Sequence, residues 1–190
     1  AYEAMLPEHP EYESLAGQIR GLEAAPKPVE GKVYNHAVAG VHAFLTVGRA
    51  LIFSEDKMEA YQQQLYAQFE RALDDDVYEN SMAYGKQVAD HIMAWADKDM
   101  YKQSRTFPKF TVKDEPGRWQ PTPPDYMDGI EPHWSAIRPL LIDSAQQFRP
   151  APPTPFSLDE DSQFYKEMME VYETGVNLSD EQEEIAKFWD

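Results

Sequence analysis

The sequence of 190 residues contains no cysteine, which excludes disulfides, thiolate catalysis and zinc sites with sulfur ligands. This absence leaves the compartment open, because many secreted bacterial proteins also lack cysteine. Long apolar runs are absent as well, whereas a helix that spans a bilayer needs roughly 18 apolar residues or more. The longest apolar stretch, residues 38–53, is interrupted by His42, Gly48 and Arg49. We therefore expect no membrane span.

Basic residues are also scarce, with 17 Lys and Arg against 34 Asp and Glu, for a formal charge of -17. Phosphate backbones and anionic lipids bind to clusters of Lys and Arg, so we predict that nucleic acid is not a partner. The acidic residues are scattered along the expected helix faces, which indicates solubility rather than a site. Hydrophobic residues make up 42% of the chain, which is enough apolar surface to form a core.

Helical periodicity dominates residues 1–100. Residues 1–6 are typical of the last turns of a helix, and a short helix is expected at 11–22. Three apolar stripes then predict three longer helices. The stripe of the first helix consists of Val38, Val41, Leu45 and Ile52. The second helix, with Ser54 as N-cap, is expected to bury Met58, Tyr61, Leu65, Phe69 and Ala72. The third follows the acidic turn 74–76, with a stripe of Val77, Ser81, Tyr84, Val88, Ile92 and Trp95.

Prolines recur through residues 101–156 and end the periodicity, since each proline fixes φ and removes a backbone donor. We predict an extended, irregular segment here, with polyproline conformation at 121–124 and 150–155 and a short helix at 134–141. The segment is rich in Trp, Tyr and Phe, which indicates that it packs against other parts of the protein.

Helical signals return near the end of the chain. Ser157 is predicted to cap a helix that Gly175 closes. Ser179 and Gln182 form a capping box that opens a last helix.

The last helix carries large apolar residues with no Gly or Pro terminator after them. We expect the chain to be interrupted within this helix. In that case Phe188 and Trp189 would be frayed, folded back onto Phe164 and Met168, or covered by another copy of the chain.

No combination of residues forms a known catalytic or metal-binding motif. The five histidines lack the His-Glu-x-x-His spacing of zinc sites, and His42 and His91 are typical of helix-flank histidines with a local hydrogen bond. The acidic runs 74–76 and 159–161 lack the Gly and the final Glu of a calcium loop, and neither a Gly-x-Ser-x-Gly nor a glycine-rich phosphate loop is present. Three arginines could hold carboxylates or phosphates but are expected to pair with the abundant acids: Arg118, Arg138 and Arg149.

An ordered series of short motifs nevertheless resembles a known family. These are Gly-Arg-Trp-Gln-Pro-Thr-Pro-Pro-Asp-Tyr at 117–126, Glu-Pro-His-Trp at 131–134 and Asp-Ser-Ala-Gln-Gln-Phe-Arg-Pro-Ala-Pro-Pro at 143–153. Together with the opening Ala-Tyr-Glu-Ala and the closing Ile-Ala-Lys-Phe-Trp-Asp, they resemble the N-terminal half of bacterial vanadium-dependent haloperoxidases and their relatives in the type 2 phosphatidic acid phosphatase superfamily.

This resemblance implies an all-helical fold and, in the whole protein, an oxyanion pocket for vanadate or phosphate. In the family, a Lys–Arg pair, a Ser-Gly-His segment and a later Arg and His hold the oxyanion. Here no His follows a Gly, and no Arg is followed six residues later by His. Before the Arg-Pro pairs at Arg138 and Arg149, Glu131 and Ile142 occupy the positions of the family's lysine. We therefore expect no catalytic residue and no metal ligand in this chain.

The resulting hypothesis is an all-α helical bundle portion with a long proline-rich segment, which belongs to an enzyme of halide oxidation or phosphate-ester hydrolysis. It divides into N-terminal helices at 1–100, an irregular wrap at 101–156 and a helical hairpin at 157–190 that leads into a missing C-terminal catalytic half. That half is the expected partner, and assembly into a homo-oligomer is left open as a second possibility. The family implies a location in the cell envelope, in the periplasm or outside the cell. The residues proposed to line a substrate channel, or else to be simple aromatic packing, are Trp119, Tyr126, His133, Trp134 and Arg149.

An alternative hypothesis is a non-enzymatic helical interaction module. It would present the proline-rich residues 150–155 to an aromatic groove of a partner.

Overall fold

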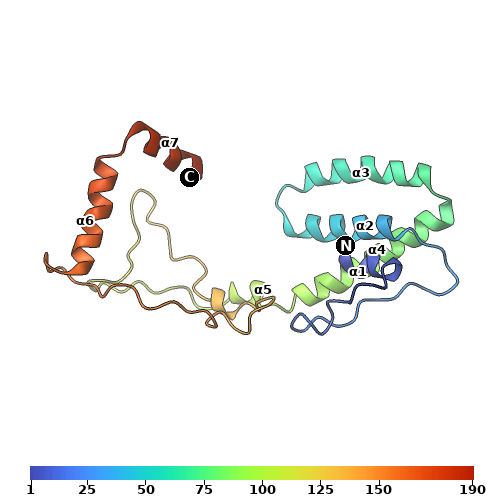
Figure 1. The fold of residues 1–190 in the computed structure, drawn as a ribbon, viewed down its shortest axis with the longest axis horizontal. Coiled ribbons are helices and arrows are strands. Elements are labelled where there is room, and N and C mark those ends of the chain that lie inside the picture. Colours follow the sequence, from blue (N-terminus) through green and yellow to red (C-terminus); the bar gives the residue numbers. More distant parts are fainter. The chain divides into compact units, whose positions relative to one another are not determined.

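The computed structural model describes residues 1–190 and is helical without a β-sheet, which confirms the expected all-α class (Figure 1). The only strand-like pairing is an isolated bridge between Ala16 and Ile19. The chain forms two compact units: unit 1 comprises Ala1–Pro108 and Glu131–Gln147, and unit 2 comprises Lys109–Ile130 and Phe148–Asp190. None of the helices is both long enough and apolar enough to cross a membrane.

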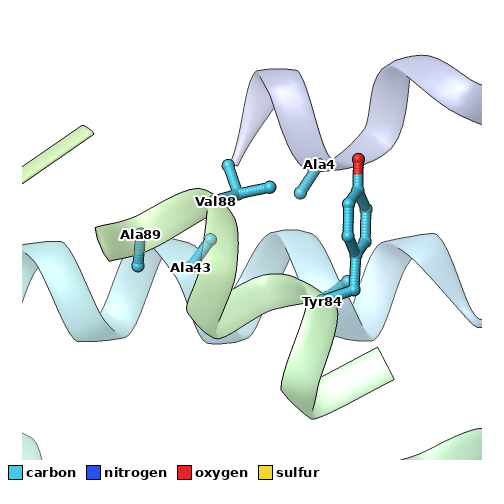
Figure 2. Packing of buried hydrophobic residues seen from close by; sticks show 6 residues of the cluster. Ala4, Ala43, Tyr84, Val88 and Ala89 are labelled. Atoms are coloured by element: carbon cyan, nitrogen blue, oxygen red, sulfur yellow. The ribbon is translucent and has the colours of Figure 1, made fainter. Parts of the chain in front are cut away.

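Unit 1 is built on the crossing of α2 (His36–Leu51) and α4 (Asp75–Ala96), with α1 (Tyr2–Met5) against both (Figure 1). The core at this crossing consists of Ala4, Ala39, Ala43, Tyr84, Val88 and Ala89. Small side chains let the two helices approach closely: a Cβ on Gly85 would lie 2.5 Å from the Ala39 carbonyl oxygen. Figure 2 shows Val88 and Tyr84 of α4 pointing toward Ala4 of α1. The stripe predicted on α4 therefore contains the centre of this core.

The N-terminus of α2 is tied to α4 by a buried serine. The Asn35 side chain accepts a hydrogen bond from the Val38 N–H at 3.0 Å and so caps α2. Ser81 is fully buried; its hydroxyl accepts from the Asn35 N–H at 2.8 Å and donates to the Val77 carbonyl at 2.6 Å. The hydroxyl of Ser81, the polar residue in the predicted apolar stripe, thus both accepts and donates a hydrogen bond.

The predicted second long helix exists as α3 (Glu55–Ala72), but its predicted burial is wrong. None of its residues is buried, and Tyr61 is 58% exposed. The reason is that α3 packs on α2 and more weakly on α4, so much of its surface stays exposed. Ser54 occupies the N-cap position as predicted, although its side chain makes no capping hydrogen bond.

The helix predicted at residues 11–22 is wrong, because this segment forms turns. Glu3 is 7% exposed, and its carboxylate accepts hydrogen bonds from the Ser14 hydroxyl at 2.9 Å and the Leu15 N–H at 2.8 Å. Gly17 and Gly21 have φ values of +79° and +70°. A carboxylate from α1 therefore organises the turns in place of a helical ladder.

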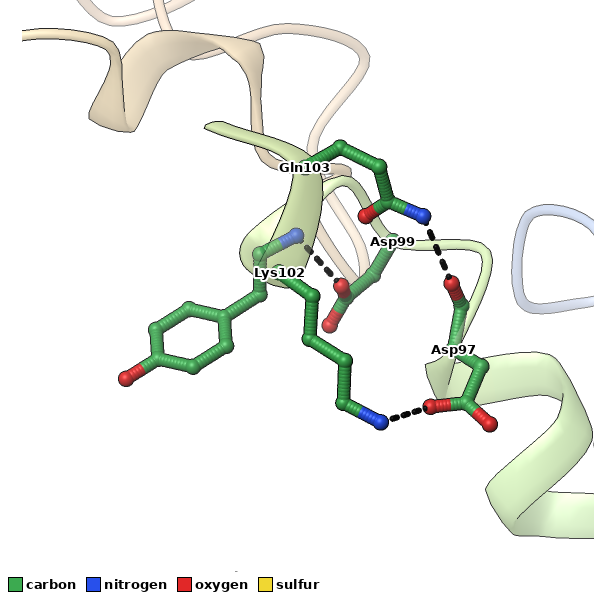
Figure 3. Close-up of polar contacts among 5 residues, drawn as sticks. Asp97, Asp99, Lys102 and Gln103 are labelled. Carbon is green, nitrogen blue, oxygen red and sulfur yellow. Dashed lines mark hydrogen bonds and ion pairs between the residues drawn. The ribbon is translucent and has the colours of Figure 1, made fainter. Parts of the chain in front are cut away.

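The proline-rich segment is irregular as predicted, and its two helical elements are one turn each: α5 (Tyr101–Ser104) and the 3-10 helix η2 (Trp134–Ala136). The helix expected at 134–141 is thus shorter than predicted. Two aspartates shape the turn before α5 (Figure 3): Asp99 Oδ1 accepts from the Tyr101 N–H at 2.7 Å, and Asp97 Oδ1 lies 2.6 Å from Lys102 Nζ. The Asp97 carbonyl also accepts from Gln103 Nε2 at 3.2 Å.

Unit 2 contains α6 (Gln163–Val176) and α7 (Asp180–Trp189). The start predicted for α6 is wrong: the Ser157 hydroxyl accepts from the Asp159 N–H, and Ser162 caps α6 by accepting from the Tyr165 N–H at 3.1 Å. Gly175 was expected to close this helix, but it lies inside α6. The capping box that opens α7 is confirmed.

The last residues of α7 are helical through Trp189. Phe188 and Trp189 are 78% and 80% exposed, and their rings pack edge to face at 5.2 Å. Phe164, the expected contact for these rings, packs instead against Phe156 at 5.2 Å. Of the three predicted states, folding back onto Phe164 and Met168 is therefore not found, whereas fraying and cover by another copy of the chain stay predictions.

Candidate functional site

The five candidate channel residues fall into two groups. His133 and Trp134 belong to unit 1, whereas Trp119, Tyr126 and Arg149 belong to unit 2. The proposal that all five line one channel stays a prediction.

In unit 1, His133 and Trp134 lie at the start of η2, and each packs against a different aromatic residue. The His133 Nε2 lies 2.8 Å from the Pro108 carbonyl oxygen, and its ring packs edge to face on Phe107 at 5.2 Å. A carbonyl only accepts, so Nε2 carries the hydrogen in this bond. Trp134 packs edge to face on Tyr101 at 6.3 Å and is otherwise exposed. Both residues therefore attach the 131–134 segment to the region around α5.

Arg105 completes this group, and the sequence analysis missed it. Its guanidinium lies 4.6 Å from the Tyr101 ring centroid, and Nη2 donates to the Tyr101 hydroxyl at 2.5 Å. The same Nη2 lies 2.8 Å from Glu131 Oε1. The Glu131 carboxylate therefore offsets part of the charge of Arg105. The four-residue spacing from Tyr101 to Arg105 was the available signal.

The second arginine of unit 1, Arg138, holds a helix end. Its Nη2 donates to the Trp95 carbonyl at 2.7 Å, and its guanidinium lies 4.3 Å from the Trp95 ring centroid. Its backbone N–H donates to the Asp99 carbonyl at 2.8 Å. Pairing with an acid was expected for Arg138, Arg118 and Arg149, but only Arg118 has such a partner, Glu115 at 3.3 Å. For Arg138 that expectation is wrong, because a helix C-terminus supplies the acceptor.

In unit 2, Trp119 lines a groove of about 370 Å³. The lining residues are Phe110, Thr111, Lys113, Gly117, Arg118 and Trp119. Trp119 packs edge to face on Phe110 at 5.6 Å. Tyr126 and Arg149 are exposed and are not part of this lining. The structure thus places one of the three unit 2 candidates in a cavity.

The histidines outside the candidate set each have a separate partner. His36 Nδ1 lies 3.0 Å from the Ala4 carbonyl, and His91 Nε2 lies 3.0 Å from the Glu23 carbonyl. His9 Nδ1 lies 3.1 Å from Glu11 Oε1. A backbone hydrogen bond, and then the hydrogen bond with His9, lower the pKa of the Glu11 carboxyl.

The last histidine, His42, hydrogen-bonds the Tyr66 hydroxyl, which also accepts from Gln62 Nε2 at 2.7 Å. Burial, and then the positive charge of Lys86, lower the pKa of His42. Burial likewise raises the pKa of Tyr66.

An oxyanion such as vanadate needs several cationic and N–H donors that converge on one point. In this chain, Arg105 and Arg138 are engaged by Glu131 and Trp95, and the histidines face carbonyl, carboxylate or hydroxyl oxygens. No group of three or more His, Asp or Glu side chains is placed to hold a metal ion. Neither Arg105 nor Arg138 belongs to such a convergent set of donors, and the expected absence of vanadate ligands from this chain stays a prediction.

No family model matches the chain, and no curated protein sequence matches it. Among solved structures, the chain is similar to one described as the first bacterial vanadium-dependent iodoperoxidase. The two are 52% identical, with a TM-score of 0.89, and the match covers 100% of this chain. The resemblance to the vanadium-dependent haloperoxidases is confirmed. The haloperoxidase-like chain spans 47% of that iodoperoxidase, less than half its length.

Proposed function

We propose that this haloperoxidase-like chain is the helical portion of an enzyme that oxidises halide with peroxide, and that it supports an oxyanion pocket formed by other residues of the whole protein. The observation that carries this proposal is the similarity over the whole chain to a vanadium-dependent iodoperoxidase, at 52% identity. Because the match spans 47% of that protein, the relative has more than half its length left to supply further residues. Vanadate would belong to that remaining part.

The geometry of unit 1 supports a scaffolding role. Its arginines and His133 are used to fix chain segments: Arg105 through Glu131, Arg138 through Trp95, and His133 through the Pro108 carbonyl. Catalytic cations are held near the substrate, whereas these groups are occupied by protein acceptors. We extend the proposal to Trp134 of unit 1 and, independently, to Trp119 and Tyr126 of unit 2, as exposed aromatic residues that would line access to the pocket in the whole protein.

Two other functions remain as alternatives. Phosphate-ester hydrolysis would use the same kind of oxyanion pocket, but the similarity to an iodoperoxidase favours halide oxidation. A helical interaction module would use the proline-rich residues 150–155, which are mostly exposed and lie in unit 2. This alternative predicts that the gene product contains no oxyanion-binding residues.

The gene that encodes this chain separates the three functions. We expect its remaining coding sequence to contain a Ser-Gly-His and an Arg followed six residues later by His. The purified whole protein should then oxidise iodide with hydrogen peroxide and hydrolyse a phosphate monoester poorly. Phosphatase activity without halide oxidation would favour the hydrolase, and a gene product without both motifs would favour the interaction module.

A further inference from the structure

The groove of unit 2 is lined by two packed aromatic rings and by residues of one closed loop. Phe110 and Trp119 meet at an interplanar angle of 81°, which leaves a ring face and a ring edge for an incoming planar group. The loop is closed by Gln120 Nε2, which donates to the Lys113 carbonyl at 2.6 Å. The groove is therefore held by contacts within its own loop.

A glycine fixes the turn that places the cation of this groove. Gly117 has φ +77°, and a Cβ at this position would lie 2.8 Å from Cγ of Phe156. The Arg118 N–H donates to the Glu115 carbonyl at 3.1 Å and closes the turn. Since both the backbone conformation and the space require glycine, Arg118 and Trp119 follow at defined positions on the groove wall.

Two basic residues line this groove, although the chain is acidic overall. Lys113 and Arg118 line it, and no acidic side chain does. The ion pairs of the chain involve Lys86, Lys102, Lys109 and Lys187, but not Lys113. Arg118 has Glu115 at 3.3 Å, a pair exposed to solvent and so a weak competitor for another anion. In a chain of formal charge -17, this cavity thus combines two cations with two aromatic rings.

We propose that this groove binds a small, flat aromatic carboxylate. Its ring packs on Trp119 and Phe110, and its carboxylate lies between Lys113 and Arg118. The volume of about 370 Å³ suits a ligand of this size, since small-molecule pockets begin near 300 Å³. The proposal concerns binding alone, goes beyond halide oxidation and does not rest on it.

The test is a calorimetric titration of the 190-residue chain with benzoate, benzamide and acetate. We expect saturable binding of benzoate and much weaker binding of the other two, because benzamide lacks the charge and acetate lacks the ring. Equal binding of benzamide and benzoate, or of acetate and benzoate, would overturn the proposal. So would the absence of saturable benzoate binding.

Charge variants locate the site. Lys113→Gln should weaken benzoate binding about two- to fivefold, the range for one exposed charge pair. Glu115→Gln removes the competitor of Arg118 and should tighten binding by a similar factor. Lys109→Gln is the matched control, since Lys109 pairs with Asp128 at 3.5 Å and does not line the groove. If Lys109→Gln and Lys113→Gln have equal effects, benzoate responds only to overall charge and the groove is not the site.

Discussion

Arg138 caps the C-terminal end of α4 while its guanidinium stacks on the ring of Trp95, the residue whose carbonyl it binds at 2.7 Å. The Trp95 indole N–H in turn donates to the Arg20 carbonyl at 3.0 Å. A cation is favoured at a helix C-terminus and over an aromatic face, so both interactions act in the same direction. One side chain thus joins the 131–147 segment to the helical core of unit 1.

Arg138→Ala should therefore destabilise the chain. The lost charged hydrogen bond and cation–π contact predict a decrease of about 2 kcal/mol in the free energy of unfolding, measured by urea denaturation. Arg138→Lys should recover only part of this, because lysine keeps the charge but not the planar stack. Arg149→Ala is the control: Arg149 is exposed and forms no ion pair, so its loss should change stability by less than about 0.5 kcal/mol. Equal effects of the two alanine variants would contradict this account.

A matched pair of glycine substitutions tests the crossing of α2 and α4. Gly85→Ala places a Cβ 2.5 Å from a backbone oxygen of α2, so we expect a loss of about 1–3 kcal/mol. Gly175→Ala in α6 meets nothing within 4 Å and should stabilise its helix by about 0.5–1 kcal/mol. Thermal unfolding followed by circular dichroism measures both. A neutral Gly85→Ala would show that the two helices do not approach as closely as described.

The lowered pKa of His42 predicts a pH-dependent stability. The ordinary value is 6.5, and in the folded chain burial and Lys86 disfavour the charged ring, while Asp90 acts in the opposite direction. As the pH falls below 6.5, the unfolded chain takes up a proton that folded His42 resists, so stability is lost from 6.5 down to the folded pKa. Above 6.5 this contribution is fully present.

His42→Asn keeps an acceptor near the Tyr66 hydroxyl and does not titrate. Urea denaturation across this pH range should show a shallower dependence for His42→Asn than for the unmodified chain. His91→Gln, which replaces a histidine on α4 rather than α2, serves as the control and should leave the His42 contribution to the pH dependence in place. An unchanged slope in His42→Asn would mean that His42 is not the group responsible.

The elements that could be predicted from the sequence are those that local signals specify. The stripe from Val77 to Trp95 and the Ser179 capping box predicted α4 and the start of α7, since periodicity and caps depend on nearby residues. The turns at 11–22 were missed because they depend on the Glu3 carboxylate, which is remote in the sequence. For α6, both Ser157 and Ser162 are suitable N-caps, and the wrong one was chosen.

The candidate site was predicted less well, because its contacts are non-local. His133 reaches the Pro108 carbonyl, and Arg138 reaches Trp95. No spacing rule connects residues that far apart, so sequence patterns could name the residues but not their partners. For Arg105, the four-residue spacing pointed to Tyr101, but nothing local pointed to Glu131, which completes its environment.

Vanadate-dependent iodide oxidation by the whole gene product tests the proposed function most directly. The protein would be stripped of oxyanion, divided, and assayed for triiodide formation from iodide and hydrogen peroxide with and without added vanadate. The 190-residue chain would be assayed in parallel. We predict activity only for the whole protein and only with vanadate. Turnover by the 190-residue chain, or none by the vanadate-loaded whole protein, would contradict the account.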